Sequence, residues 1–191
     1  MLWNRRRSQV TVPLGLLLVV TVVPVRGQPK SAGEISSGYQ LHHAVNSRAV
    51  PRGWFVSGGP YVTAGIAVIG EVARSHGSRA VAGVPGIGPE ASGDETTYMA
   101  GVLWRRPARS VTVFARFLVG ARRLAVHRDL TGTAAGWSTV GSAIQAGGGV
   151  DIPFTARSAV RLAGTYLRLP SDDVGGHAAR LAIGTVYRFG H

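Results

Sequence analysis

The sequence predicts an all-β fold, an eight-stranded antiparallel up-and-down barrel, and two observations carry that prediction. After residue 30, apolar residues recur at every second position in one segment after another, which is the period of β-strands, and long runs with the helical period are missing. The connections between these segments also alternate between short turns and longer loops. A chain of 191 residues with 27 glycines suits one such domain.

The composition excludes several classes of protein. Only 16% of the residues are charged, below the roughly 25% of typical soluble domains. The absence of cysteine rules out disulfides and thiolate metal sites. The net charge of +12 comes from arginines scattered along the chain, so clustered phosphate contacts are not indicated and we expect no nucleic-acid partner.

The first 27 residues have the layout of a secretory signal peptide. Arg5–Arg7 form a positive start, Val10–Val25 is apolar, and Val25–Gly27 offers modest side chains for cleavage. The apolar run of about 16 residues is short of the roughly 20 that span a bilayer as a helix, although an uncleaved anchor stays an alternative. We therefore expect a signal peptide over residues 1–27 and a barrel domain over residues 28–191.

Four strands are predicted in the first half of the barrel domain. The most regular alternation puts Ile66 and Val68 on one face and Glu71 on the other. Tyr98 and Trp104 likewise share a face, whereas the first two segments alternate more weakly. The four predicted strands span residues 34–43, 53–60, 64–76 and 95–106.

Four more strands are predicted in the second half. From residue 179 to 190 the odd positions are mostly large and apolar, and the even positions are small residues with Arg180 and Arg188. Asp151 and Arg161 also lie opposite apolar faces, whereas Phe114 and Leu118 interrupt the polar face of their segment. The predicted strands span residues 110–127, 138–153, 158–169 and 177–190.

The predicted connections differ at the two ends of the barrel. Those after the second, fourth and sixth strands are short and are accompanied by Pro60, Pro107 and Pro153. Those after the first, third, fifth and seventh strands are mostly longer. Short turns at one end and long loops at the other are typical of outer-membrane barrels.

Alternation alone leaves two orientations open. A soluble barrel would enclose its apolar face, whereas a membrane barrel turns that face to lipid and keeps a polar interior. The second face of these strands is mostly glycine and alanine with scattered charges, which suits the crowded lumen of a small barrel. We expect these charged residues to point into a closed lumen: Glu71, Arg116, Arg122, Asp151, Arg161 and Arg180.

Ion pairs are expected inside this lumen, because lone charges are costly to bury. Glu71 is the central candidate. Its candidate partners are Arg116, Arg161 and Arg180, and the choice among them depends on the strand register.

Aromatic residues gather near the ends of the predicted strands. Barrels place aromatic girdles there, at the level of the lipid head groups, although ordinary packing is the alternative for each residue. The aromatics with this distribution are Trp54, Phe55, Trp104, Trp137, Phe154, Tyr187 and Phe189, and the girdle is predicted above all at Trp54, Trp104, Trp137 and Phe154.

The chain ends in GTVYRFGH, residues 184–191, which is similar to the assembly signal of outer-membrane barrels. That signal is a glycine, two residues, and then two aromatics separated by one residue, and Gly184, Tyr187 and Phe189 match it. Two departures are visible. Ala182 stands where the signal carries a polar residue, and two residues follow the last aromatic.

Over roughly residues 31–191 the sequence resembles the OmpA/OmpX-like family of small outer-membrane β-barrel proteins. Residues 147–169 are much like that family's sixth strand, tight turn and seventh strand. The resemblance implies a monomeric barrel in the outer membrane of a Gram-negative bacterium, with outer-membrane lipid and the barrel assembly machinery as partners. It implies little about activity, because members serve as structural, adhesive or resistance proteins.

We therefore expect a structural outer-membrane barrel of unknown specific role, with surface loops available to ligands or surfaces and with no catalytic residue, metal or cofactor. One alternative is a soluble exported barrel that binds a small apolar ligand. The other is a lipid A-modifying enzyme, because His76-Gly77-Ser78 matches the His-x-Ser stretch of the lipid A deacylases, where a Ser–His pair cleaves an ester. His42 and His43 are adjacent, so on a strand they point to opposite faces and cannot chelate one metal together.

The signal peptide can be tested directly. We expect cleavage after Gly27, because the charged start and the short apolar run precede modest residues at that point. N-terminal sequencing of the exported protein should begin at Gln28, within a few residues. Membrane-extracted protein that still carries Arg5–Arg7 would contradict this prediction.

Overall fold

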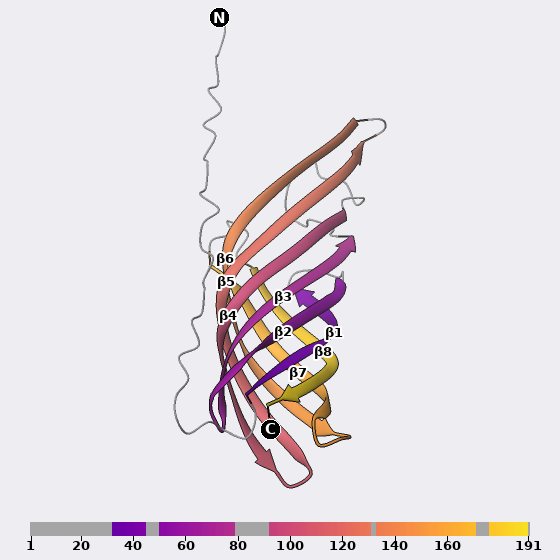
Figure 1. The fold of residues 1–191 in the computed structure, drawn as a ribbon. Coiled ribbons are helices and arrows are strands. Elements are labelled where there is room, and N and C mark those ends of the chain that lie inside the picture. Colours follow the sequence, from indigo (N-terminus) through magenta and orange to yellow (C-terminus); the bar gives the residue numbers. More distant parts are fainter. Residues whose placement is uncertain (1–31, 45–49, 79–91, 131–132, 171–175, 191) are drawn as a thin grey trace, which may run out of the picture.

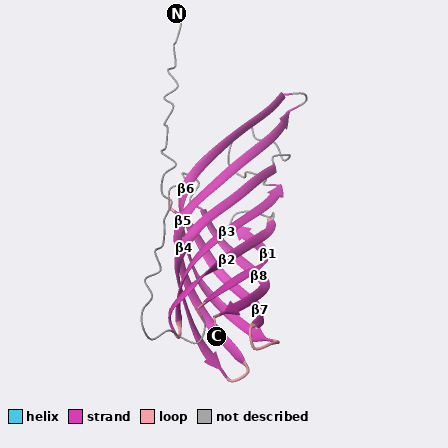
Figure 2. Cartoon of the chain, in the orientation of Figure 1, coloured by secondary structure: helices cyan, strands magenta, loops and turns pink. Residues whose placement is uncertain are grey.

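The computed structural model describes residues 32–44, 50–78, 92–130, 133–170 and 176–190, which form a closed barrel of antiparallel strands (Figure 1, Figure 2). The predicted fold class is confirmed, whereas the predicted signal peptide lies outside the described residues. Within them, no helix is long and apolar enough to cross a bilayer. The strands are β1 (Gly33–Ala44), β2 (Arg52–Thr63), β3 (Ile66–Ser78), β4 (Ser92–Ala108), β5 (Val111–Leu130), β6 (Thr133–Pro153), β7 (Ser158–Leu169) and β8 (Gly176–Phe189).

Each strand pairs with the next, and the barrel closes where β8 pairs with β1. Gly38 and Gly184 lie opposite each other at this seam. A Cβ atom added to Gly38 would lie 2.1 Å from the carbonyl oxygen of Ile183, and one added to Gly184 would lie 2.2 Å from that of Ser37. The two strands approach so closely that only glycine fits at both positions without a backbone shift.

Side chains alternate between the lumen and the outer surface along the strands. In β8, Leu181 and Ile183 point outward and are 64% and 56% exposed, whereas Arg180 points inward and is 2% exposed. The same alternation runs through β7, where every second side chain from Ala159 to Leu169 is buried. The large apolar faces therefore point away from the barrel axis, and the faces that carry charged residues line the lumen.

The lumen also holds hydrophobic side chains. Phe114 and Leu118, which interrupt the polar pattern of β5, are buried there with Ile69 and Leu103. Phe55 is also buried, so its assignment to the outer aromatic girdle is wrong. Neighbouring residues of a strand point to opposite faces, so Phe55 and the outward-facing Trp54 cannot both face lipid.

One predicted loop is part of the sheet. Residues 128–137 were expected to connect two strands, but β5 continues to Leu130 and β6 begins at Thr133, and the two remain paired along this stretch. β6 pairs with β7 only from Ile144 onward, so the upper part of the β5–β6 hairpin projects beyond the remaining strands (Figure 1). The backbone ladder therefore continues through a stretch whose sequence no longer alternates between apolar and polar residues.

The end of β8 gives a test of assembly. Tyr187 and Phe189 point outward and are about equally exposed, at 45% and 44%. If the assembly machinery reads these aromatics, Phe189→Ala should strongly lower the amount of folded barrel in the membrane, measured by quantitative gel analysis of membrane fractions. Loss of contacts alone should have a modest effect, because one exposed aromatic contributes little to folded-state packing.

The matched control is Phe154→Ala, since Phe154 is also an exposed aromatic at the end of the barrel where the chain terminates. We expect normal levels of folded barrel in that variant. If Phe189→Ala and Tyr187→Ala also gave normal amounts of folded barrel in the membrane, the end of the chain would not be a recognition signal.

Candidate functional site: the charged lumen

Charged side chains from seven strands meet inside the barrel. Within the described residues, five arginines and four carboxylates form ion pairs in the lumen. They fall into three groups, which we call the inner, middle and outer clusters, the inner one lying at the end where β1 begins and β8 ends. All six charged residues expected in the lumen lie there, joined by Glu34, Glu95 and Arg188.

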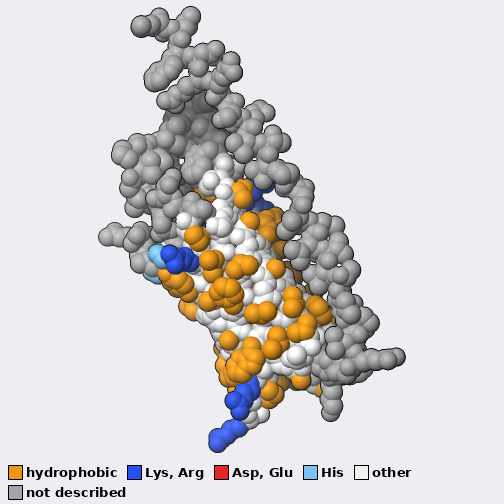
Figure 3. All heavy atoms as spheres, turned by 90° about the vertical axis from the view of Figure 1, so that its left-hand side faces the viewer, with side chains coloured by type: hydrophobic (Ala, Val, Ile, Leu, Met, Phe, Trp, Pro, Cys, Tyr) orange, Lys and Arg blue, Asp and Glu red, His pale blue; other side chains and the backbone are white. Residues whose placement is uncertain are grey.

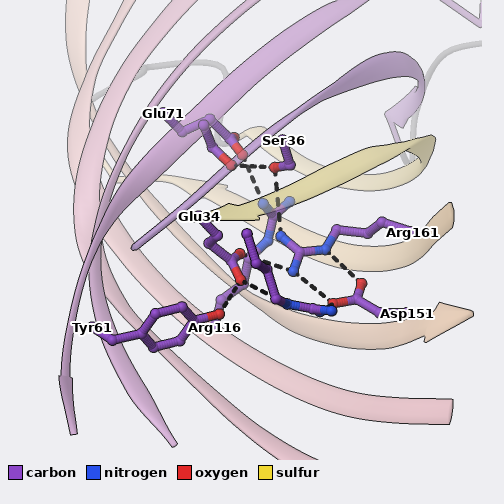
Figure 4. A network of polar contacts seen from close by, with 9 residues as sticks. Glu34, Ser36, Tyr61, Glu71, Arg116, Asp151 and Arg161 are labelled. Carbon is purple, nitrogen blue, oxygen red and sulfur yellow. Dashed lines mark hydrogen bonds and ion pairs between the residues drawn. The ribbon is translucent and has the colours of Figure 1, made fainter. Parts of the chain in front are cut away.

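The inner cluster is built around Arg161 of β7 (Figure 4). Its Nε and Nη2 atoms donate to the two carboxylate oxygens of Asp151 at 2.7 and 2.9 Å, a bidentate pairing that suits the planar guanidinium. Nη2 also lies 2.9 Å from Oε1 of Glu34. The guanidinium lies 4.4 Å from the centre of the Phe114 ring, so an apolar residue of the lumen supports the charge as well.

Arg188 completes the inner cluster. Its Nη2 donates to Oδ2 of Asp151, and its Nε lies 3.8 Å from Oε2 of Glu34. The Tyr61 hydroxyl donates to the same glutamate oxygen. Two arginines therefore face two carboxylates, and the charges of the inner cluster balance.

The middle cluster places one carboxylate between two arginines. Glu71 of β3 accepts from Nη1 of Arg116 through Oε2 and from Nη1 of Arg180 through Oε1, both at 2.7 Å. Arg180 also donates to Gln145 at 3.2 Å, and its guanidinium lies 5.4 Å from the centre of the Phe55 ring. Of the three expected partners of Glu71, Arg116 and Arg180 contact it, whereas Arg161 belongs to the inner cluster.

Positive charge is in excess in the middle cluster. The Nε and Nη2 atoms of Arg116 and Arg180 are buried without a hydrogen-bond partner among the described residues. Both guanidinium groups thus depend on one carboxylate, which is buried with them at 3% exposure. Glu71 is the residue whose loss would leave the most uncompensated charge in the lumen.

The outer cluster is smaller. Arg122 of β5 lies 3.2 Å from Glu95 of β4, in a pair that is mostly buried. Nearby on β1 and β3, the Gln40 amide donates to the Ser75 hydroxyl at 2.9 Å. Polar contacts thus continue toward the long-loop end of the barrel.

Sequence reasoning missed Glu34, Tyr61, Glu95 and Arg188 as members of the network. Glu34 could have been found, because it begins a polar face of β1 that continues through Ser36 and Gln40. That signal is weak because Ser37 and His43 interrupt the apolar residues on the opposite face of β1. Glu95 is the first residue of its predicted strand, after a predicted loop, so the alternation of side chains could not assign it to the inner face.

The other predicted site residues lie on the outer surface or at the seam. Trp54, Trp104 and Phe154 are exposed, at 45%, 47% and 62%. The side chain of Trp137 lies outside the described residues. Gly184 lies at the β1–β8 seam, while the two aromatics of the predicted assembly signal point outward.

The His-x-Ser stretch lies at the outer end of β3. Nδ1 of His76 is 2.9 Å from Oδ1 of Asp94, so the imidazole has a carboxylate beside it on the outer surface. The side chain of Ser78 lies outside the described residues. Across the described ranges, no three histidine, aspartate or glutamate side chains are grouped so that they could hold a metal ion.

Comparison with solved structures finds small outer-membrane barrels. The chain is similar to Ail, the attachment invasion locus protein of Yersinia pestis, with a TM-score of 0.59 and 18% identity over 84% of this chain and 99% of that one. It is also similar to Neisserial surface protein A, with a TM-score of 0.65 and 14% identity over 83% of this chain and 98% of that one. OprG from Pseudomonas aeruginosa matches with a TM-score of 0.55 and 11% identity, over 85% and 98% of the two chains.

These similarities confirm the fold predicted from the sequence, that of a small eight-stranded barrel of the kind found in outer membranes. No family model matches the chain, and no curated protein matches it either. The identities are low, from 11% to 18%, so these similarities establish how the chain folds.

Glu71 provides a test of the lumen network. Glu71→Gln keeps the size of the side chain but leaves Arg116 and Arg180 without their carboxylate, so we expect the free energy of unfolding to fall by about 3–5 kcal/mol. Urea unfolding of the folded barrel in lipid vesicles, followed by tryptophan fluorescence, measures this change.

The control is Asp94→Asn, which removes a carboxylate from the exposed pair with Arg74 and should cost about 1 kcal/mol or less. Adding Arg180→Gln to Glu71→Gln should restore part of the lost stability, because it removes surplus positive charge. Equal, small losses in Glu71→Gln and Asp94→Asn would mean that the lumen is hydrated and the middle cluster is not buried.

Proposed function

We propose that the protein is a structural β-barrel of a Gram-negative outer membrane, with lipid around its outer surface and a lumen closed by its own side chains. The observation that carries the proposal is the inversion of polarity. Charged side chains are buried inside the barrel, and large hydrophobic side chains cover its outside. In a bilayer this arrangement keeps the apolar face in lipid while every strand finds its backbone partners in the closed sheet.

The outer surface supports the membrane location. Hydrophobic side chains cover the middle of the face drawn in Figure 3, and arginines lie toward its ends. Exposed aromatics occur at both ends of the strands, for example Trp54 and Tyr98 toward the long loops and Trp104 and Tyr187 toward the short turns. Such girdles fit the two head-group regions of a bilayer. Residues from all eight strands contribute to the exposed apolar surface: Ile35, Val56, Val72, Val102, Phe117, Ile152, Leu162 and Ile183.

The contents of the lumen support a closed barrel. An eight-stranded barrel is just wide enough for its side chains to fill, and here long arginines cross it in the inner and middle clusters. The hydrophobic cluster around Leu103 and Leu118 occupies further space. These contents favour a packed interior over a continuous water channel.

The charged side chains in the lumen also argue against a soluble exported barrel that binds a small apolar ligand. A carrier of a small apolar ligand needs an apolar interior, whereas five arginines and four carboxylates occupy this one. We propose outer-membrane lipid and the barrel assembly machinery as partners of a monomeric barrel. The long loops are the part of such a barrel that is available to ligands or surfaces on the cell exterior.

Fractionation and planar-bilayer recording test the two halves of the proposal. We expect the protein in the outer-membrane fraction, extracted only by detergent and running at a different position on unboiled and boiled gels. After reconstitution we expect no steady, large conductance, because the lumen is filled.

Recovery from the periplasm without detergent would contradict the membrane location. Steady, large conductance from the unmutated protein would contradict the closed lumen while leaving the membrane location in place. Trp104→Phe, which retains an aromatic at the short-turn interface, serves as a control variant expected to behave like the unmutated protein in both measurements.

A further inference from the structure

Charge is distributed unevenly between the inside and the outside of the barrel. Four of the carboxylates in the described residues point into the lumen, where arginines pair with them. Among the residues whose side chains the structure describes, Asp94 is the one carboxylate on the outer surface. The outward-facing arginines therefore have few protein anions to pair with.

Several of these cations gather at the long-loop end of β2 to β5. Trp54, Arg74, Thr96 and Arg123 are direct neighbours across the four strands. The next row toward the loops contains Arg52, His76 and Asp94, also direct neighbours. These cations lie on the outside of the barrel, and we call Arg52, Arg74, His76 and Arg123 the surface basic cluster.

The cluster begins where the apolar surface ends. The row below it, toward the short turns, reads Val56, Val72, Tyr98 and Ala121 on the same four strands. The first row of the cluster pairs Trp54 directly with Arg74. An interfacial aromatic beside an arginine, directly above an apolar row, marks the level of lipid head groups.

The geometry lets two arginines reach one anion. Arg74 and Arg123 lie on either side of Thr96, so their backbones are separated by two strand spacings, about 10 Å. Both side chains are long and exposed, and Thr96 between them adds a hydroxyl group. Asp94 contacts Arg74 at 3.3 Å and His76 at 2.9 Å, which leaves three arginines against one carboxylate.

We propose that the surface basic cluster binds the phosphate group of an anionic lipid in the membrane leaflet that surrounds the long-loop end of the barrel. Arg74 and Arg123 hold the phosphate from two sides, Thr96 donates a hydrogen bond, and the acyl chains lie along the apolar row below. This inference rests on the proposed membrane location and deepens it, because it names the lipid that the surface selects.

Trp54 provides a local reporter of the bound lipid. The chain has four tryptophans, so replacing Trp3, Trp104 and Trp137 with phenylalanine leaves Trp54 as the single fluorophore beside Arg74. The full-length protein carrying these changes is reconstituted in phosphatidylcholine vesicles. Its fluorescence is then quenched by either phosphatidic acid or phosphatidylcholine with brominated acyl chains, at equal mole fractions.

We expect brominated phosphatidic acid to associate at Trp54 about fivefold or more tightly than brominated phosphatidylcholine, because each arginine near a membrane surface adds roughly that factor. The preference should fall toward one in the Arg74→Gln/Arg123→Gln variant. It should be unchanged in the matched control Arg106→Gln/Arg157→Gln, which removes two exposed arginines at the opposite end.

Different failures are distinguishable. Equal quenching by both lipids, or an unchanged preference in Arg74→Gln/Arg123→Gln, would overturn the lipid site while leaving the membrane location intact. If neither brominated lipid quenches Trp54, the barrel is not in the bilayer, and the proposed location falls together with the site. Loss of the preference on adding soluble pyrophosphate, at constant ionic strength, would show that the cluster takes free phosphate and would overturn its assignment to a lipid.

Discussion

A guanidinium enclosed in a narrow barrel has to find a carboxylate on another strand, and the rest of this structure depends on that requirement. The pairs do not follow the order of the chain. Glu34 of β1 contacts Arg161 of β7, and Glu71 of β3 contacts Arg180 of β8. Both contacts join the first three strands to the last two, across the seam where the sheet closes. A sheet that is only partly closed would leave Glu34 and Arg180 without these partners, so ion pairing favours closure of the barrel.

Small residues make room for these long side chains. Gly147 and Gly149 of β6 belong to the lumen-facing set that also contains Asp151. A Cβ on Gly149 would lie 1.9 Å from the carbonyl oxygen of Leu162, so the strand passes its neighbour too closely for any larger residue. Glycine at this position thus has a steric cause, the close approach of β6 and β7, and it also keeps lumen volume free for the long side chains.

The sequence predicted what depends on local pattern and missed what depends on register. Alternation in residues 179–190 identified which side chains of β8 point inward, and Arg180 lies there. The choice among three arginines for Glu71 required the register of strands that are distant in the chain, which a single sequence does not contain. Phe55 was misassigned because proximity to a strand end was weighed above the face on which it lies. The β5–β6 extension was missed because residues 128–137 do not alternate between apolar and polar residues in the sequence.

That hairpin has a practical consequence. Between Thr133 and Ile144, β6 pairs only with β5, since its pairing with β7 begins at Ile144. The hairpin is two-stranded only past the Ser92–His127 pairing of β4 with β5, and such a segment adds little stability of its own. A peptide epitope grafted between Leu130 and Thr133 would be carried away from both the lumen and the bilayer, which makes this tip the natural place to convert the barrel into a display scaffold.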